Sequence, residues 1–144
     1  MDDALDAVRA VTSGRYWGLL GIEYLEAERG RTLCRIDLRD EHLNYNDVVH
    51  GGVISGLIDS AAGGAVRTLR SLDEIAQRPH ATSDLHVTYL SAASGTALVA
   101  EARTVRIGRT AIFTEVDVRD DRDRLVARGM VTFVIGQGPP VRRD

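Results

Sequence analysis

Residues 51–66, GGVISGLIDSAAGGAV, constrain the fold more than any other part of this chain. Their large apolar side chains recur at helical spacing and leave almost no polar face, which predicts a helix that is buried nearly all round. The segment is also rich in glycine, and each interior glycine costs about 1 kcal/mol of helix propensity relative to alanine. We therefore expect a sheet, or another helix, to approach this helix closely and compensate for that cost.

Strand patterns surround this helix. Alternating apolar residues predict two strands before it, near residues 20–24 and 33–38, joined by a turn at 29–31 into a hairpin. Four more patterns follow it, near residues 84–89, 98–102, 112–118 and 125–135. Short turns between strands favour an antiparallel sheet. The fold class is therefore α+β, with one sheet wrapped around one long central helix.

The rest of the chain adds little to this core. With 144 residues, the sequence predicts one domain spanning 1–144, with residues 1–15 as an N-terminal helix or arm and 137–144 as a flexible tail. A short helix is expected near residues 4–10 and a loop at 71–80. No segment repeats.

Composition narrows the classes of function. A net charge of −3 argues against a nucleic-acid partner. No run approaches the roughly 20 apolar residues of a membrane span, and the acidic start is no signal peptide, so we expect a cytoplasmic protein. The single cysteine, Cys34, and four scattered histidines lack the spacing of a metal site. No phosphate-binding loop or dinucleotide motif is present, so we expect neither a metal nor a cofactor.

Asp59 is the only charged residue in the central helix. A buried carboxylate is unfavourable unless it is paired, hydrogen-bonded or next to a cavity. In a cavity, it is a candidate general base. The alternative is structural: the side chain faces solvent, or it pairs with Ser55 or Ser60.

His50-Gly51-Gly52 stands at the predicted start of the helix. A helix N-terminus has unpaired N–H groups and partial positive charge, and glycines let a ligand oxygen come close to them. This arrangement suits the polarisation of a carbonyl group. The alternative is that the glycines ease a tight turn and His50 packs or caps the helix.

The segment NYNDVVHGGVISGLID, residues 44–59, resembles the phenylacetate-degradation (PaaI-like) type of thioesterase in the hotdog superfamily. The strand SDLHVTYLSAA from residue 83 and the stretch from residue 103 to 133 are similar as well, so the resemblance covers roughly residues 15–136. It implies a hotdog fold, hydrolysis of an acyl-CoA thioester, and a homodimer or a dimer-of-dimers tetramer.

The resemblance also assigns roles. Asp59 matches the catalytic carboxylate, which acts as general base or nucleophile. The Gly51 N–H, after His50, matches the group that polarises the carbonyl. Asn44 matches a residue that orients the water or the thioester, and Thr82 one that contacts the water or the carboxylate. The implied site lies between two subunits, with Asp59 from one and the loop of residues 44–51 from the other.

Substrate binding is expected at two further places. Gly52 lets the substrate approach the helix N-terminus, and Arg106, Gly108 and Arg109 form a turn whose arginines suit the phosphates of CoA. The structural alternative is that the residues of this turn are simply solvated.

Two positions depart from what the resemblance implies. Asp47 stands where the family has a glycine. The strand alternation also places Thr82 on the face opposite Leu85, Val87 and Tyr89, so either a bulge re-aims Thr82 or its assignment is wrong.

Two other functions compete with hydrolysis. One is a non-catalytic acyl-CoA binding protein of the hotdog type, which the unusual Asp47 favours. The other is hydration or dehydration of an acyl thioester, which needs a histidine and an acid in other places.

Overall fold

The computed structural model describes residues 3–138 as one six-stranded antiparallel sheet and a set of helices. The strands are β1 (Ile22–Glu28), β2 (Arg31–Asp37), β3 (His80–Tyr89), β4 (Ala97–Ile107), β5 (Ala111–Asp120) and β6 (Leu125–Ile135). Their order across the sheet is β1-β2-β4-β5-β6-β3. This is the α+β hotdog architecture expected from the sequence. The last six residues of the expected tail, 139–144, lie outside the described residues.

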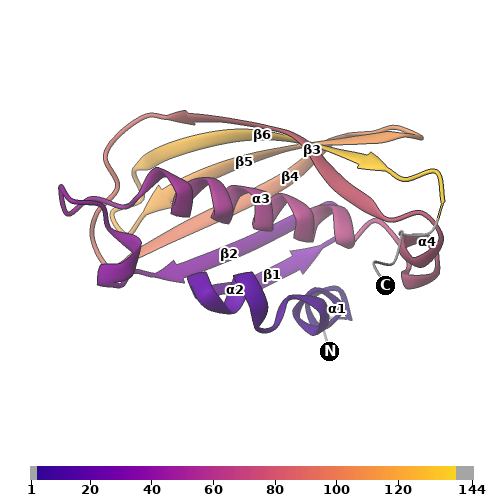
Figure 1. Cartoon of the computed structure of the whole chain (residues 1–144), viewed down its shortest axis with the longest axis horizontal. Coiled ribbons are helices and arrows are strands. Elements are labelled where there is room, and N and C mark those ends of the chain that lie inside the picture. The colour runs from indigo at the N-terminus through magenta and orange to yellow at the C-terminus, as the bar shows by residue number, and fades with distance from the viewer. Residues whose placement is uncertain (1–2, 139–144) are drawn as a thin grey trace, which may run out of the picture.

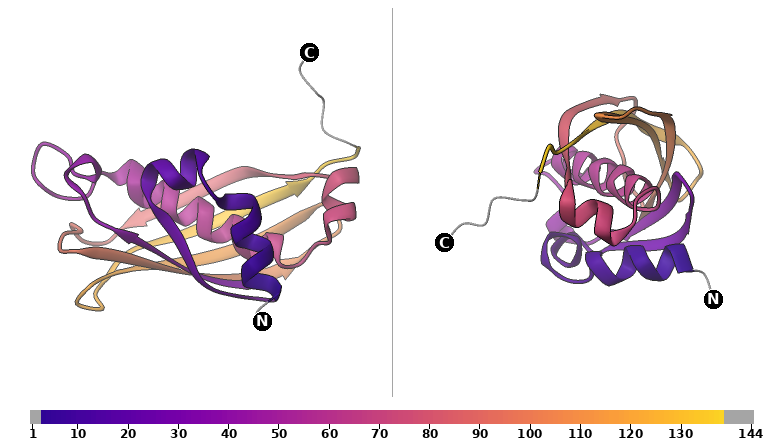
Figure 2. Two further views of the ribbon diagram at one scale, coloured as in Figure 1. Left: turned by 90° about the horizontal axis from the view of Figure 1, so that it is seen from below. Right: turned by 90° about the vertical axis from the view of Figure 1, so that its right-hand side faces the viewer.

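The central helix, α3 (Gly51–Arg67), runs along the sheet, and the sheet curls around it (Figures 1 and 2). Ten of its residues are buried, and they pack against inward-facing side chains of every strand from β1 to β6. Leu57 and Ile58 in the middle of the helix are fully buried. The nearly continuous apolar surface of this helix is therefore the reason that one sheet has to enclose it.

Close approach of neighbouring elements explains two of the glycines in α3. A Cβ at Gly64 would lie 2.5 Å from the Tyr24 ring of β1, and a Cβ at Gly56 would lie 2.6 Å from the Tyr16 hydroxyl. Larger residues would push these elements away from the helix. The compensation expected from the sequence is thus confirmed at both positions.

Helices at the N-terminus extend the layer that contains α3. The helix expected near residues 4–10 is present as α1 (Asp3–Thr12), and a second helix, α2 (Arg15–Leu20), follows it. Both pack against β1 (Figure 2). The sequence analysis did not predict α2, because Gly14, Gly18 and Gly21 interrupt the apolar stretch in which it lies.

The expected loop at residues 71–80 was only partly right, because it contains a short helix, α4 (Leu72–Gln77). Ser71 caps this helix by accepting a hydrogen bond from the Glu74 N–H, while the Glu74 carboxylate accepts one from the Ser71 N–H. This reciprocal cap satisfies two backbone donors and stabilises a helix of only six residues. A further turn of 3-10 helix, Asp40–His42, precedes the loop that leads to α3.

Strand β3 forms one edge of the sheet and pairs only with β6 among the described residues. It is ten residues long, contains no proline, and leaves Leu85 and Tyr89 partly exposed. An edge of this length with unpaired backbone groups is a template for pairing with another strand. The opposite edge, β1, is shorter, is interrupted by a bulge, and carries Glu23, Glu26 and Glu28.

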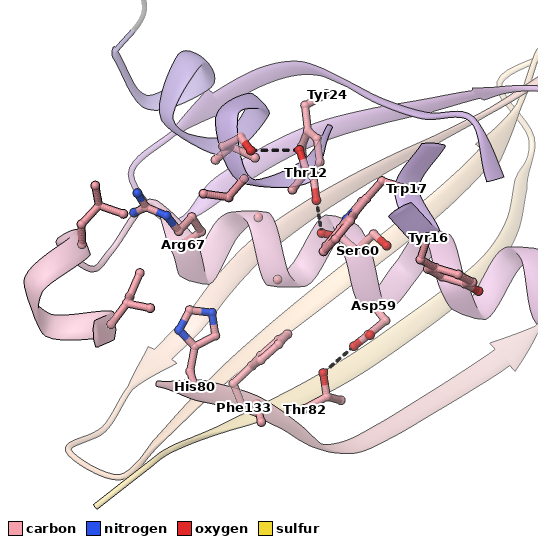
Figure 3. Close-up of a pocket in the computed structure, with 17 residues that line it drawn as sticks. Thr12, Tyr16, Trp17, Tyr24, Asp59, Ser60, Arg67, His80, Thr82 and Phe133 are labelled. Carbon is pink, nitrogen blue, oxygen red and sulfur yellow. Dashed lines mark hydrogen bonds between the residues drawn. The ribbon is translucent and has the colours of Figure 1, made fainter. Parts of the chain in front are cut away.

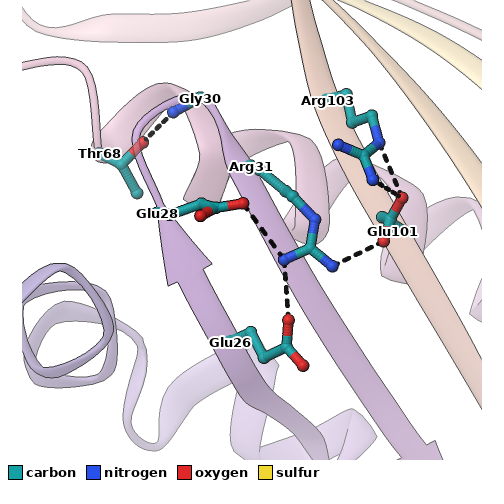
Figure 4. A network of polar contacts seen from close by, with 7 residues as sticks. All are labelled: Glu26, Glu28, Gly30, Arg31, Thr68, Glu101 and Arg103. Carbon is teal, nitrogen blue, oxygen red and sulfur yellow. Dashed lines mark hydrogen bonds and ion pairs between the residues drawn. The ribbon is translucent and has the colours of Figure 1, made fainter. Parts of the chain in front are cut away.

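Charged residues hold the β1 side of the sheet together on its outer face (Figure 4). The Arg31 guanidinium contacts Glu26 at 2.8 Å and Glu101 at 2.7 Å, which ties β2 to both of its neighbours. Glu101 also pairs with Arg103 at 2.6 Å. At the β1–β2 turn the Gly30 N–H donates to the Thr68 hydroxyl at 2.8 Å, which joins this turn to the end of α3.

No helix in residues 3–138 combines the length and the apolar character that a membrane crossing requires.

Candidate active site

A pocket of about 490 Å³ lies between the N-terminal helices, one face of α3, α4 and the start of β3 (Figure 3). Its walls are mostly apolar, with side chains from α1, α2, α4 and β6: Val8, Val11, Trp17, Leu72, Ile75 and Phe133. Asp59 and Thr82 lie together at one end. A mainly apolar cavity with a few polar groups is the usual form of a small-molecule site.

Thr82 holds the Asp59 carboxylate directly. Its hydroxyl donates a hydrogen bond to Asp59 Oδ1 at 2.7 Å, whereas no hydrogen bond to Ser55 or Ser60 is formed by this carboxylate among the described residues. The register of β3 against β6 shifts between Thr82 and Asp84, so the chain bulges there. The bulge turns Thr82 to the helix side of the sheet and resolves the conflict with the strand alternation.

The N-terminus of α3 is capped by His50. Its Nδ1 accepts a hydrogen bond from the Gly52 N–H at 2.8 Å. The Gly51 N–H, in the first turn, has no carbonyl partner within the helix and is available to a ligand. On the other side the Tyr89 hydroxyl donates to the Gly51 carbonyl at 2.8 Å. The cap therefore fixes the position of Gly51 and leaves its N–H free.

The loop before the helix is ordered by Asn44. Asn44 Oδ1 accepts from the Asn46 N–H at 2.9 Å, and the Asn44 carbonyl accepts from the Asp47 N–H at 3.0 Å. With its oxygen engaged, the amide of Asn44 presents its NH₂ group as a donor. Asp47 has φ 59°, in the left-handed region. Glycine fits this conformation without strain and aspartate tolerates it, so the position has a backbone requirement that both residues meet.

One chain does not bring the two halves of the expected site together. Gly51 and Asp59 lie eight residues apart on the same helix, which corresponds to roughly 12 Å along its axis. The pocket that contains Asp59 and Thr82 is not lined by Asn44, His50 or Gly51. A carbonyl group next to Asp59 is therefore out of reach of the Gly51 N–H of the same chain.

The expected CoA-binding turn lies at the other side of the molecule from the helix N-terminus. Arg106 is in β4 and borders a separate hollow of about 380 Å³ with Arg29 and Leu69. Gly108 follows the strand, and a Cβ there would lie 2.8 Å from the Ala111 carbonyl oxygen, so the tight turn alone accounts for this glycine. Arg109 is exposed in the same turn. None of these residues lines the Asp59 pocket.

Sequence reasoning missed most of the pocket. Tyr24, whose hydroxyl donates to the Ser60 carbonyl at 2.5 Å, forms one wall. Arg67 and His80 lie at the end opposite Asp59 (Figure 3). Arg67 could have been found from the sequence, because it follows Asp59 and Gly63 at four-residue spacing on one helix face. No local pattern in the sequence marks His80 as part of this pocket.

His80 is neutral at ordinary pH. Burial, together with the nearby charges of Arg70 and Arg67, lowers the pKa of His80 to about 4. Its ring meets Phe133 edge-on, with 5.8 Å between ring centroids. In residues 3–138, no group of three or more His, Cys, Asp or Glu side chains is arranged to hold a metal ion.

Comparisons with known proteins agree with this architecture. The family model described as "Thioesterase superfamily" matches residues 46–127, which include the helix N-terminus, Asp59 and Thr82. Human acyl-coenzyme A thioesterase 13 is 29% identical over 135 residues, covering 91% of this chain and 93% of the human protein. A putative esterase of Halobacterium salinarum is 33% identical over 142 residues, with 92% of each chain covered.

Among solved structures, the Escherichia coli PaaI protein from the phenylacetic acid degradation operon superposes with a TM-score of 0.82. The superposition covers 94% of this chain and 95% of PaaI, at 17% sequence identity, and so concerns the fold. The family match and the H. salinarum relative establish the family directly: this chain belongs to the thioesterase superfamily.

Proposed function

We propose that this protein is an acyl-CoA thioesterase, which hydrolyses an acyl-CoA thioester to a free acid and CoA. The observation that carries the proposal is the Asp59 carboxylate, which Thr82 holds at 2.7 Å at the end of a largely apolar pocket. The similarity to human acyl-coenzyme A thioesterase 13 supports CoA as the thiol. Asp59 is the catalytic residue of this proposal.

The chemistry follows from the free oxygen of this carboxylate. Thr82 occupies Oδ1, which leaves Oδ2 to accept a proton from a water molecule. The oxygen of that water attacks the thioester carbonyl carbon and forms a tetrahedral oxyanion. Collapse of this intermediate breaks the C–S bond, and the thiolate of CoA takes up the proton. Direct attack by Asp59 on the carbonyl is the other route to the same products.

The oxyanion needs donors that Asp59 cannot supply. The Gly51 N–H suits this role because His50 fixes the helix start and the partial positive charge there stabilises an anion. Gly52 lets the ligand approach closely. Asn44, with its oxygen engaged by Asn46, directs its NH₂ group to the substrate or the water.

We propose that two subunits share each site. The roughly 12 Å between Gly51 and Asp59 on one helix supports a site that draws on two chains. Pairing of β3 with a second copy across a twofold axis satisfies its open edge and covers the exposed Leu85 and Tyr89. Such a dimer sets Gly51 of the partner subunit beside Asp59. Two of these dimers form the tetramer that we retain from the family resemblance.

CoA itself is assigned to the β4–β5 turn. Arg106 and Arg109 offer two guanidinium groups for its phosphates, and neither forms an ion pair of 4.0 Å or less among the described residues. Replacement of both arginines by glutamine is expected to raise KM with little change in kcat. The proposed location is the cytoplasm, and the single buried thiol of Cys34 fits a reducing compartment.

The test is thiol release from a panel of acyl-CoA esters by the wild type and by the variant Asp59→Asn. The variant keeps the shape of the side chain and removes its basicity. Wild-type release that the variant lowers by at least about a hundredfold supports the proposal. Equal release by both proteins contradicts the role of Asp59, and no release from any ester contradicts the enzymatic function.

A further inference from the structure

The far end of the Asp59 pocket is built to receive a charged group. Asp59, Gly63 and Arg67 follow one another at four-residue spacing on one face of α3, and all three line the pocket. Arg67 therefore lies roughly 12 Å from Asp59 along the helix axis. Gly63 between them has no side chain, which leaves the floor of the pocket clear. Figure 3 shows Arg67 and His80 at one end and Asp59 with Thr82 at the other.

Arg67 has unused hydrogen-bonding capacity. Its Nη1 donates to the Arg70 carbonyl, in the turn that follows the helix, at 2.8 Å. Its Nε is buried and has no hydrogen-bond partner among the described residues. No carboxylate of residues 3–138 lies within 4.0 Å of this guanidinium. A buried donor without a partner is unfavourable, and a shift of the Arg67 side chain that brings it to an acceptor on a ligand removes this cost.

His80 adds a second donor beside Arg67. Arg70 Nη1 lies 3.0 Å from His80 Nδ1, and because arginine can only donate, Nδ1 has to be the acceptor. The neutral ring therefore carries its proton on Nε2. Burial and the charges of Arg70 and Arg67 keep the ring neutral by lowering its pKa to about 4. The two arginines give this end of the pocket a positive potential that favours an anion.

We propose that the acyl group of the substrate is of medium length and ends in a carboxylate, which Arg67 and His80 bind at the far end of the pocket. The inference rests on the proposed function, because it takes the thioester carbonyl to lie at Asp59. The walls between the two ends are apolar and suit a methylene chain. A terminal carboxylate then accepts charge-assisted hydrogen bonds from the Arg67 guanidinium.

Matched esters test this inference. Adipoyl-CoA and hexanoyl-CoA have the same chain length and differ only in the terminal carboxylate, as do suberoyl-CoA and octanoyl-CoA. Binding is measured by calorimetry in the Asp59→Asn background, where hydrolysis is slow, and kcat/KM is measured by thiol release with intact Asp59. We expect the carboxylate to improve both quantities about tenfold or more for at least one pair.

Variants at Arg67 identify the group responsible. Arg67→Met keeps the packing of the stem and removes the charge, and it is expected to abolish the preference within each pair. Arg67→Lys is expected to retain part of it, which a purely structural role of Arg67 would not predict. Arg35→Gln, at a β2 side chain that is 42% exposed and lies outside the pocket, removes one positive charge elsewhere and serves as the matched control. Circular dichroism checks that each variant is folded.

The possible outcomes separate the two claims. If the plain acyl-CoA esters are bound and hydrolysed as well as their carboxylated counterparts, this inference is wrong and the proposed function stands. A carboxylate preference in binding without any thiol release overturns the proposed function alone. A preference that survives Arg67→Met overturns the assignment to Arg67. Binding of neither ester in both pairs overturns this inference, and the wider panel of esters then decides the proposed function.

Discussion

The contact between Gly64 and Tyr24 makes a quantitative prediction about stability. A Cβ at Gly64 would lie 2.5 Å from the Tyr24 ring and 3.1 Å from its hydroxyl oxygen. Tyr24 is only 2% exposed, and its hydroxyl donates to the Ser60 carbonyl, so moving the ring aside would break a buried hydrogen bond. Overpacking of this kind costs about 1–3 kcal/mol. The higher helix propensity of alanine than of glycine offsets about 1 kcal/mol of this cost.

The neighbouring Gly63 provides a matched control. A Cβ there meets nothing closer than the Phe133 ring, at 3.8 Å, which is ordinary contact. Gly63→Ala therefore gains about 1 kcal/mol of helix propensity without a clash. Because both substitutions gain the same propensity, the difference between them isolates the clash. We expect Gly64→Ala to be less stable than Gly63→Ala by about 1–3 kcal/mol.

Urea unfolding followed by the fluorescence of Trp17, the single tryptophan, measures this difference. Protein concentrations have to be equal, because the stability of the proposed dimer would depend on concentration. Midpoints that fall in the opposite order, or that coincide, refute the account of how the glycines let β1 approach the helix.

Three further predictions follow from other contacts. Thr82→Val removes the hydrogen bond to the Asp59 carboxylate and is expected to lower kcat/KM for thiol release about tenfold, near the lower end of the energy of a hydrogen bond to a charged group. Thr82→Ser should retain most of the rate. Full activity of the valine variant contradicts the role of the bulge. Asp47→Gly removes the cost of a left-handed backbone conformation, ~1–2 kcal/mol, and adds an entropic cost of ~0.5–1 kcal/mol from the more flexible unfolded chain. We therefore expect a slightly higher melting temperature. A lower melting temperature refutes the backbone explanation of this position. The pKa of His80 is about 4 in the folded protein and 6.5 in the unfolded chain, so the unfolded chain binds the proton first as the pH falls. Wild-type stability should therefore decrease as the pH falls from 6.5 to 4. His80→Gln should flatten this part of the curve of stability against pH, and an unchanged slope contradicts the prediction.

The sequence predicted the central features of the fold for a physical reason. Residues 51–66 have no polar face, so the helix had to be enclosed, and alternation marked all six strands. The short helix α4 was missed although its signal, Ser71 followed by Glu74 three residues later, is printed in the sequence. For α2 the signal was weaker: Gly18 lowers its helix propensity, and only Gly21, which ends the helix in the left-handed conformation, marked it.

The candidate site was predictable only in part. Asp59 stood out because a lone charge in an apolar helix needs a partner, and Thr82 is that partner in the structure. The bulge that turns Thr82 toward it depends on pairing between β3 and β6, in which Thr82 lies opposite Phe133, 51 positions later in the chain (133 − 82). The same holds for His80, whose ring contacts Phe133. Contacts over such distances in the chain leave no local pattern that a single sequence can display.

The shared site is the central claim, and mixed dimers test it most directly. Gly51→Pro removes the proposed N–H donor, and proline suits the backbone of the first helical position after the extended His50. A Cβ there would lie 3.3 Å from the Tyr89 hydroxyl, so circular dichroism has to check that the variant folds. Asp59→Asn removes the base. Each variant alone is expected to lack most activity. A mixed dimer of the two contains one site in which both the carboxylate and the Gly51 N–H are intact.

We would therefore co-express the two variants with different tags, purify the mixed species, and measure thiol release. The account predicts recovery of about half of the wild-type rate per mixed dimer, since one of its two sites is complete. The control pairs Asp59→Asn with the double variant Asp59→Asn/Gly51→Pro, in which no site is complete. Recovery in the first pair and not in the control supports a site shared between subunits. If the mixed dimer is as inactive as the two variants alone, the shared site is contradicted.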